Sequence, residues 1–206
     1  MNREGVGLAD AQEAPELKKL WRLSFPEDTE EGVAFFFQRV FQPLNCVVFR
    51  QESRPVSMAF LLPAVLHTPE GPAALHYLYA AATRPDRRGR GLFARVLCET
   101  FRVGRERGVE ASCLLPAEQG LAAYYARFGY RPFFRTVIEV KEGKKRGSGL
   151  FFSTDAGEYA LRRNRYLSHR EWWVEWPPHL LAYAVDAAVK NGGGVWLSSE
   201  GVALCE

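Results

Sequence analysis

The spacing of apolar side chains predicts that helices and strands alternate along this chain. Over residues 14–25 apolar positions recur three and four apart, with charged positions between them, which predicts an amphipathic helix ended by Pro26. The same spacing predicts a second helix over residues 30–41. Residues 46–50 and 56–62 are apolar runs on either side of a turn over residues 51–55, and they predict a hairpin. A third strand is expected over residues 75–83.

The spacing of apolar positions becomes helical after the densest cluster of Arg, Gly and Pro in the chain, residues 84–91. Beyond it we expect a helix over residues 92–107 that ends at Gly108. A strand over residues 109–115, a helix over 120–128 and a strand over 130–140 follow. This order predicts one parallel crossover, and therefore an α/β fold with a mixed (α+β) sheet.

A Lys- and Gly-rich stretch, residues 141–149, predicts a linker or long turn between a domain of residues 1–140 and a C-terminal extension of residues 150–206. Helices are expected over residues 159–167 and 180–190, and a hairpin over 195–197 and 202–204. Trp172, Trp173 and Trp176 are interpreted as packing the extension onto the central sheet. A lid over a substrate or a dimer surface is the alternative for these tryptophans.

The composition of the chain is that of an ordinary globular protein. Of the 206 residues, 47% are hydrophobic and 25% are charged, and the net charge of +3 is too small to predict a nucleic-acid or membrane partner. No apolar run approaches the roughly 20 residues that a membrane span needs. Residues 1–10 carry charges where a signal peptide would be apolar, so we expect a cytoplasmic protein.

The spacing of cysteines and histidines predicts neither a disulfide framework nor a metal site. The four cysteines lie far apart, without a CxxC pair, and are interpreted as small buried apolar residues. The four histidines also have no closely spaced partners, so no metal is expected. The residues are Cys46, Cys98, Cys113 and Cys205, and His67, His76, His169 and His179.

The loop between the third strand and the following helix carries the strongest chemical signal. Glycines at 89 and 91 allow backbone N–H groups to approach an anion, and the helix that starts near Leu92 adds its unpaired donors. Arg87, Arg88 and Arg90 add positive charge. These features predict a diphosphate site, with a solvated basic turn as the alternative. Nucleic-acid binding is disfavoured, because the Arg-Gly unit occurs once and lies between folded elements.

Two motifs resemble those of the GNAT superfamily of acyl-CoA-dependent N-acetyltransferases. Residues 78–93, LYAAATRPDRRGRGLF, are similar to motif A, Q/R-x-x-G-x-G/A, where Arg88 and Gly91 match and Phe93 replaces a small residue. Residues 114–130 are similar to motif B, which ends in Y-x-x-x-G-F/Y and places its tyrosine at Tyr125. The resemblance covers residues 17–140.

The resemblance implies a GNAT-like fold that uses acetyl-CoA (coenzyme A) as co-substrate. It implies that pantetheine binds the backbone of Ala81, Ala82 and Thr83. It implies further that the diphosphate binds at Arg88, Gly89, Arg90, Gly91, Leu92 and Phe93. Tyr125 would protonate the departing thiolate, although its spacing with Leu121, Tyr124 and Phe128 also suits a core aromatic. The general base is either Glu118 or a water relay, because residues 75–83 contain no carboxylate.

The function expected from the resemblance is transfer of an acetyl group to a primary amine of an unidentified small molecule or protein, by direct attack in a ternary complex. Tyr77 and Tyr79, which alternate onto one face of a strand, are expected to line the acceptor pocket. A non-catalytic acyl-CoA-binding sensor or interaction module is the alternative. The expected partners are the acceptor and, as one arrangement, a second copy in a homodimer. Residues 150–206 resemble, in general pattern, the start of a second acyltransferase-like half found in some tandem relatives.

Overall fold

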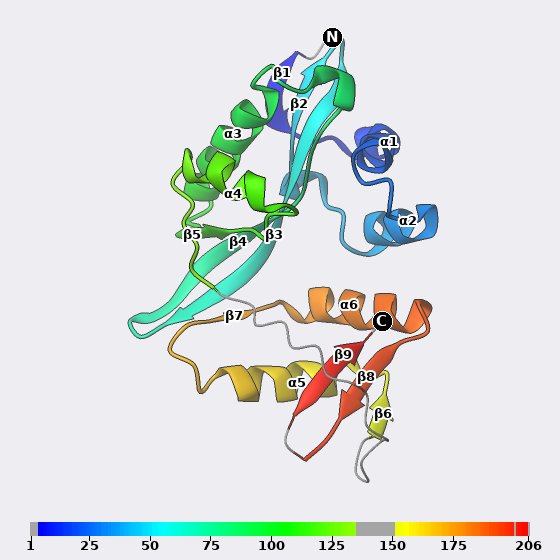
Figure 1. Ribbon diagram of the computed structural model, residues 1–206, viewed down its shortest axis with the longest axis vertical. Coiled ribbons are helices and arrows are strands. Elements are labelled where there is room, and N and C mark those ends of the chain that lie inside the picture. Colours follow the sequence, from blue (N-terminus) through cyan, green and yellow to red (C-terminus); the bar gives the residue numbers. More distant parts are fainter. Residues whose placement is uncertain (1–3, 135–150, 200, 206) are drawn as a thin grey trace.

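The computed structural model describes residues 4–134, 151–199 and 201–205, and its larger sheet has the order β1-β2-β3-β4-β5 with β7 paired to β3 (Figure 1). The strands β4 and β5 are parallel and the other pairs are antiparallel, which confirms the mixed sheet and its crossover. The strands are β1 (Gly5–Leu8), β2 (Cys46–Gln51), β3 (Arg54–Thr68), β4 (Gly71–Thr83), β5 (Ala111–Cys113) and β7 (Trp173–Glu175).

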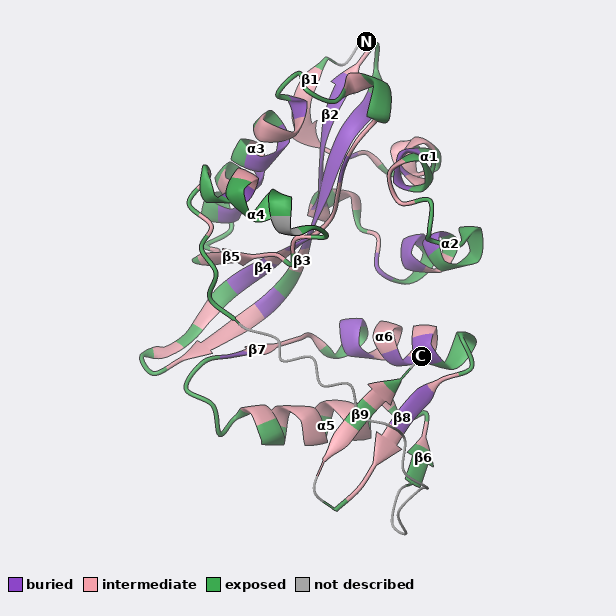
Figure 2. Cartoon of the chain, viewed as in Figure 1, coloured by how far each residue is buried: buried purple, intermediate pink, exposed green. Residues whose placement is uncertain are grey.

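Helices cover both faces of this sheet. The helices α1 (Ala14–Ser24) and α2 (Glu30–Arg39) lie on one face, and α3 (Leu92–Glu106) and α4 (Gln119–Ala126) lie on the other (Figure 1). Side chains of β2 alternate between two cores: Cys46 and Val48 pack toward α1 and α2, whereas Val47 and Phe49 pack toward α3. The strands between the helix layers are therefore buried on both faces (Figure 2). Short 3₁₀ helices are η1 (Ala11–Glu13), η2 (Pro43–Asn45) and η3 (Pro85–Arg87).

The β3–β4 ribbon is longer than the sequence pattern predicts. The strand predicted over residues 56–62 continues to Thr68, and the one predicted from residue 75 begins at Gly71. Pro63 follows the predicted end of the first of these strands, and the side chains of the added residues are mostly half-buried or exposed. The preceding turn is also tighter than expected, since only Glu52 and Ser53, both with positive φ, connect β2 to β3.

The strand β7 fastens the C-terminal extension to that ribbon. It pairs with β3 from Val65 to His67, beyond the part of β3 that pairs with β2. The His67 ring stacks on Trp173, with centroids 4.0 Å apart. Trp176 meets the ring of Tyr77 in β4 at 5.5 Å. The interpretation of these tryptophans as packing against the central sheet is confirmed for Trp173 and Trp176.

The rest of the extension forms a small second layer. Its sheet has the order β6-β8-β9, built from β6 (Phe151–Ser153), β8 (Gly194–Leu197) and β9 (Val202–Cys205). The helices α5 (Ala156–Leu167) and α6 (Pro178–Lys190) confirm the two predicted helices, and the β8–β9 pair confirms the hairpin. The helix α6 lies near α2, where Tyr183 stacks on Phe35 at 5.4 Å and Asp186 pairs with Arg39.

Some predictions for the middle of the chain were wrong, and others concern residues outside the described ranges. The strand predicted over residues 109–115 is limited to Ala111–Cys113, and residues 130–134 form no strand. Residues 135–140 and the predicted linker 141–149 lie outside the described residues.

Of the cysteines only Cys46 is fully buried, while Cys98 and Cys205 are exposed, so their common interpretation as buried apolar residues was wrong. No helix in the described ranges is long and apolar enough to cross a bilayer.

Candidate functional site

The strands β4 and β5 separate partway along β4. They pair only from Leu75 to Tyr77 on β4, although β4 continues to Thr83. The register against β3 shifts just beyond this point, between Tyr79 and Ala82, and Ala80 adopts a φ of 45°. A bulge of this kind bends a strand and raises its twist. The second half of β4 therefore leaves β5, and no described strand pairs with it on that side.

The N-terminus of α3 follows directly on this edge. Gly89 and Gly91 have φ of +74° and +69°, values that L side chains rarely adopt, and Gly91 is the N-cap of α3. A Cβ at either glycine would meet no atom within 4 Å, so the backbone conformation and not crowding requires glycine. No side chain of the described residues caps α3. Its first-turn N–H groups are therefore available to an anion.

The arginines of this loop divide into two groups. Asp86 accepts hydrogen bonds from Nε and Nη2 of Arg84 at 2.7 and 2.9 Å and lies 3.5 Å from Nε of Arg87. Within the described part of the chain, Arg88 and Arg90 form no ion pair with a carboxylate. The uncompensated positive charge therefore lies beside the two glycines.

The residues predicted to bind pantetheine carry internal hydrogen bonds. Ala82 is buried and its carbonyl accepts a bond from Ser57 Oγ at 2.9 Å. The carbonyl of Thr83 accepts a bond from Arg88 Nε at 3.0 Å. Ala81, the third predicted residue, packs partly against the α3 core. A ligand that used the Ala82 or Thr83 carbonyl would compete with these bonds.

The side chains at the start of α3 face the core. Leu92 is buried between α3 and the sheet, so only its backbone can serve the predicted anion site. Phe93, the departure from motif A, meets the rings of Tyr124 and Tyr125 at 6.1 and 6.2 Å. The larger side chain thus links α3 to α4.

Tyr125 combines the features of a core residue and of a reactive one. Its side chain is 8% exposed and packs against Phe93, Tyr124 and Tyr130. Burial raises the pKa of Tyr125 to about 12, and the neighbouring phenols of Tyr130, Tyr124 and Tyr77 add to the rise. Its hydroxyl forms no hydrogen bond with any residue that the structure describes. The phenol is consequently held neutral, with its proton available to a ligand.

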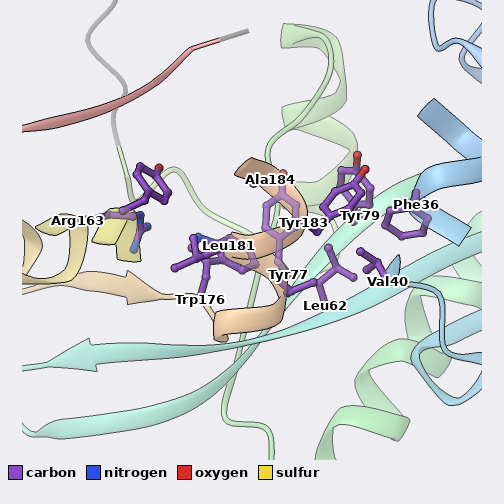
Figure 3. A pocket seen from close by; sticks show the side chains of 12 residues that line it. Phe36, Val40, Leu62, Tyr77, Tyr79, Arg163, Trp176, Leu181, Tyr183 and Ala184 are labelled. Atoms are coloured by element: carbon purple, nitrogen blue, oxygen red, sulfur yellow. The ribbon is translucent and has the colours of Figure 1, made fainter. Parts of the chain in front are cut away.

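A cleft of about 420 Å³ lies between the central sheet and the C-terminal extension (Figure 3). From the N-terminal part of the chain it is lined by Phe36, Val40, Leu62, Tyr77 and Tyr79. From the extension it is lined by Tyr159, Arg163, Trp176, Leu180, Leu181, Tyr183 and Ala184. Tyr77 and Tyr79 therefore share one pocket, as their alternation on β4 predicts. Trp176 lines the cleft, as the alternative interpretation of the tryptophans as a lid allows, whereas the contributions of α5 and α6 were not predicted.

Among the described residues that line this cleft, Arg163 is the one that carries a charge. Its Nη1 and Nη2 each donate to the carbonyl of Val174 at 3.1 Å, and Nη1 also donates to Asn164 Oδ1 at 3.0 Å. Burial lowers the pKa of Arg163, since its surroundings disfavour the charged form. No described carboxylate forms an ion pair with it, and the nearby Glu175 is bonded to His67.

The candidate base Glu118 is exposed at the residue before α4 and does not line the cleft. No Asp, Glu or His occurs among the lining residues in the described part of the chain. Among the described residues there is also no group of three or more metal-ligating side chains.

Comparison with protein families decides the assignment. A family model described as acetyltransferase (GNAT) domain matches residues 6–133. The chain belongs to this GNAT family. The resemblance drawn from motifs A and B is thereby confirmed, and so is the fold class. Comparison with curated proteins found no match.

Solved structures share the GNAT fold over different lengths. A conserved Enterococcus faecalis protein, described as a probable N-acyltransferase, has a TM-score of 0.70 and 19% identity and covers 98% of this chain. A Pyrococcus horikoshii protein assigned as an acetyltransferase has a TM-score of 0.69 and 15% identity and covers 99%. This chain spans 53% and 69% of those two proteins. A Brucella melitensis GNAT family acetyltransferase in complex with acetyl-CoA has a TM-score of 0.50 and 14% identity. The match covers 70% of this chain and 95% of that protein.

Proposed function

We propose that this GNAT protein transfers the acetyl group of acetyl-CoA to a primary amine. The observation that carries the proposal is the uncapped N-terminus of α3, preceded by two glycines with positive φ, beside the opened edge of β4. A diphosphate fits such a site, because backbone N–H groups and the helix dipole both favour an anion. The acetyl-CoA in the Brucella melitensis relative supports the choice of ligand.

The residues proposed to bind acetyl-CoA form two groups along the chain, one for the diphosphate and one for the pantetheine. The backbone N–H groups near Gly89 and Gly91 and at the start of α3 would hold the diphosphate, with positive charge from Arg88 and Arg90. The edge of β4 would hold the pantetheine. The full set is Ala81, Ala82, Thr83, Arg88, Gly89, Arg90, Gly91, Leu92 and Phe93. When bound, acetyl-CoA supplies an acetyl group activated as a thioester.

In the transfer, the acceptor nitrogen bonds to the carbonyl carbon, the carbon–sulfur bond breaks and the amine loses a proton. Tyr125 would donate a hydrogen bond to the departing sulfur. Because its pKa is about 12 and that of a thiol is about 8.5, complete proton transfer from Tyr125 would be uphill by roughly 5 kcal/mol. Tyr125 therefore acts as a hydrogen-bond donor, and solvent protonates the thiolate. The amine proton would leave through water, since the lining residues that the structure describes include no carboxylate or histidine.

We also propose that residues 1–140 form the acetyltransferase domain and that residues 150–206 form an extension, whose described part closes one side of the acceptor cleft. The support is the shared lining of the cleft and the pairing of β7 with β3.

The test is release of the coenzyme A thiol from acetyl-CoA in the presence of amines, amino acids, polyamines, antibiotics and peptides, with the acetylated product identified by mass spectrometry. Amine-dependent release supports the proposal. Binding of coenzyme A without transfer to any amine would instead identify an acyl-CoA-binding sensor. Absence of binding would overturn the proposal altogether.

A further inference from the structure

The cleft beside β4 is aromatic, and its charge has a single sign. Four tyrosines and Trp176 contribute to its walls, and among the described lining residues the one ionisable group that is charged at neutral pH is the Arg163 guanidinium. A polyamine or other polycation needs carboxylates to compensate each desolvated charge. The described lining offers none, so it disfavours an acceptor with several positive charges.

The two ends of the cleft differ. Figure 3 shows Arg163 at one end of the row of lining side chains and Phe36 at the other, with Tyr77 between them. The Phe36 end includes Tyr79, whose ring lies 5.5 Å from that of Phe36. Tyr79 directly precedes Ala80, where β4 bulges and turns away from β5. The reacting nitrogen therefore belongs at the Tyr79 end, and Arg163 lies at the far end.

Arg163 is positioned for an acidic group. Its hydrogen-bond partners are the Val174 carbonyl, the Asn164 amide oxygen and the Tyr159 side chain, which fix the guanidinium but do not neutralise it. The Glu175 carboxylate favours its charged form from nearby without forming an ion pair with it. A planar guanidinium recognises a carboxylate through paired hydrogen bonds, and such bonds are among the strongest in proteins. Between the two ends, Trp176 and Tyr77 meet edge to face and provide aromatic surface for a ring.

We infer that the acetyl acceptor, if the proposed acetyl transfer is the reaction, is a primary amine on an aromatic body with an acidic group at the end opposite the amine. The amine lies toward Tyr79, the ring lies against Tyr77 and Trp176, and the acidic group bonds to Arg163.

The experiment compares three phenethylamines that differ only in the substituent opposite the aminoethyl group: a carboxylate, a carboxamide or a dimethylaminomethyl group. They have the same body and one primary amine each, and the substituent is negative, neutral or positive; the tertiary amine is not itself an acetyl acceptor. Wild-type kcat/KM should be highest for the carboxylate and at least about tenfold lower for the dimethylaminomethyl compound. Equal values, or a preference for the dimethylaminomethyl compound, would overturn the inference.

Variants assign the preference to Arg163. In Arg163→Gln the carboxylate compound should lose about tenfold in kcat/KM while the carboxamide compound changes little, so the order of the three disappears. Arg163→Lys keeps the positive charge and should retain part of the order. The control is Arg170→Gln, which removes an exposed charge that lies against Tyr166 outside the cleft and should leave the order intact. Because only the order is read, a uniform loss from altered folding does not imitate the result. An unchanged order in Arg163→Gln would contradict the inference.

Failure of this inference can be told apart from failure of the proposed function. Spermidine and a lysine-containing peptide are assayed beside the three aromatic amines. Faster transfer to spermidine or the peptide would overturn the acceptor class and leave acetyl transfer standing. Absence of transfer to every amine would overturn both.

Discussion

The ring of Phe93 meets the ring of Tyr125 edge to face, with centroids 6.2 Å apart. Phe93 stands where the motif-A pattern has a small residue, and Tyr125 stands at the motif-B tyrosine. The side chain that departs from one motif thus supports the proposed hydrogen-bond donor of the other. This contact connects the first turn of α3 with α4.

Replacing Phe93 by Ala should loosen Tyr125. We expect kcat to fall about tenfold and the free energy of unfolding to fall by about 2 kcal/mol, because the ring is only partly buried. The control is Phe41→Ala, which removes a partly buried ring from the core on the opposite face of the sheet. Steady-state kinetics and thermal unfolding of both variants provide the comparison. A similar kcat in Phe93→Ala and Phe41→Ala would refute the supporting role.

Tyr125→Phe should lower kcat by about a hundredfold, since it removes a donor that acts on the leaving sulfur. The KM for acetyl-CoA should stay within about twofold, because the ring and its packing remain. Because burial holds the pKa of Tyr125 at about 12, wild-type kcat should show no loss attributable to this group between pH 7 and pH 10. Pre-steady-state and steady-state rates across that range test both statements. A variant with wild-type turnover would remove Tyr125 from the mechanism.

Gly91 and Gly108 offer a matched pair at the two ends of α3. Both have φ of +69°, and a Cβ at either meets nothing within 4 Å. Alanine at each should therefore cost a similar amount of stability, about 1 kcal/mol, from backbone strain alone. Only Gly91→Ala should weaken coenzyme A binding, by about tenfold, since its methyl group would occupy the approach to the helix N-terminus. Calorimetric titration measures this difference, and equal dissociation constants would argue against the site.

The buried ion pair between Arg50 and Glu13 should be a main determinant of stability at the N-terminus. Arg50 is 5% exposed and donates to both carboxylate oxygens of Glu13, at 2.6 and 2.7 Å. Glu13→Gln would leave the guanidinium buried without its counter-charge, at a cost of about 3–5 kcal/mol. Glu16→Gln, which breaks an exposed pair with Lys19, should cost less than about 1 kcal/mol. Urea denaturation measures the free energy of unfolding of both variants. Equal losses in the two would contradict the predicted role of the buried pair.

The sequence was informative where local pattern determines structure. The glycines at 89 and 91 and the periodic helix behind them predicted the loop and α3, because φ preference and amphipathic spacing act over a few residues. The alternation of Tyr77 and Tyr79 likewise predicted that they share a pocket. The strands β1 and β6 were not predicted, since each is short and depends on a partner strand far away in sequence.

The far wall of the cleft could not be predicted for a related reason. Arg163 and Tyr183 lie on separate helices of the extension, and nothing in their local sequence indicates that both face β4. The signal available was the spacing of Tyr159 and Arg163, four apart and hence on one face of α5. It acquires meaning only after β7 has paired with β3 and brought the extension to the sheet.

The most direct test compares acetyl-CoA with acetyl-pantetheine, which has the thioester and the pantetheine arm but lacks the diphosphate and the adenosine 3′-phosphate attached to it. The account predicts that acetyl-CoA binds and raises the melting temperature, whereas acetyl-pantetheine binds at least about a hundredfold more weakly. If the two ligands bind equally, or if saturating acetyl-CoA leaves the melting temperature unchanged, the glycine loop before α3 does not bind a diphosphate.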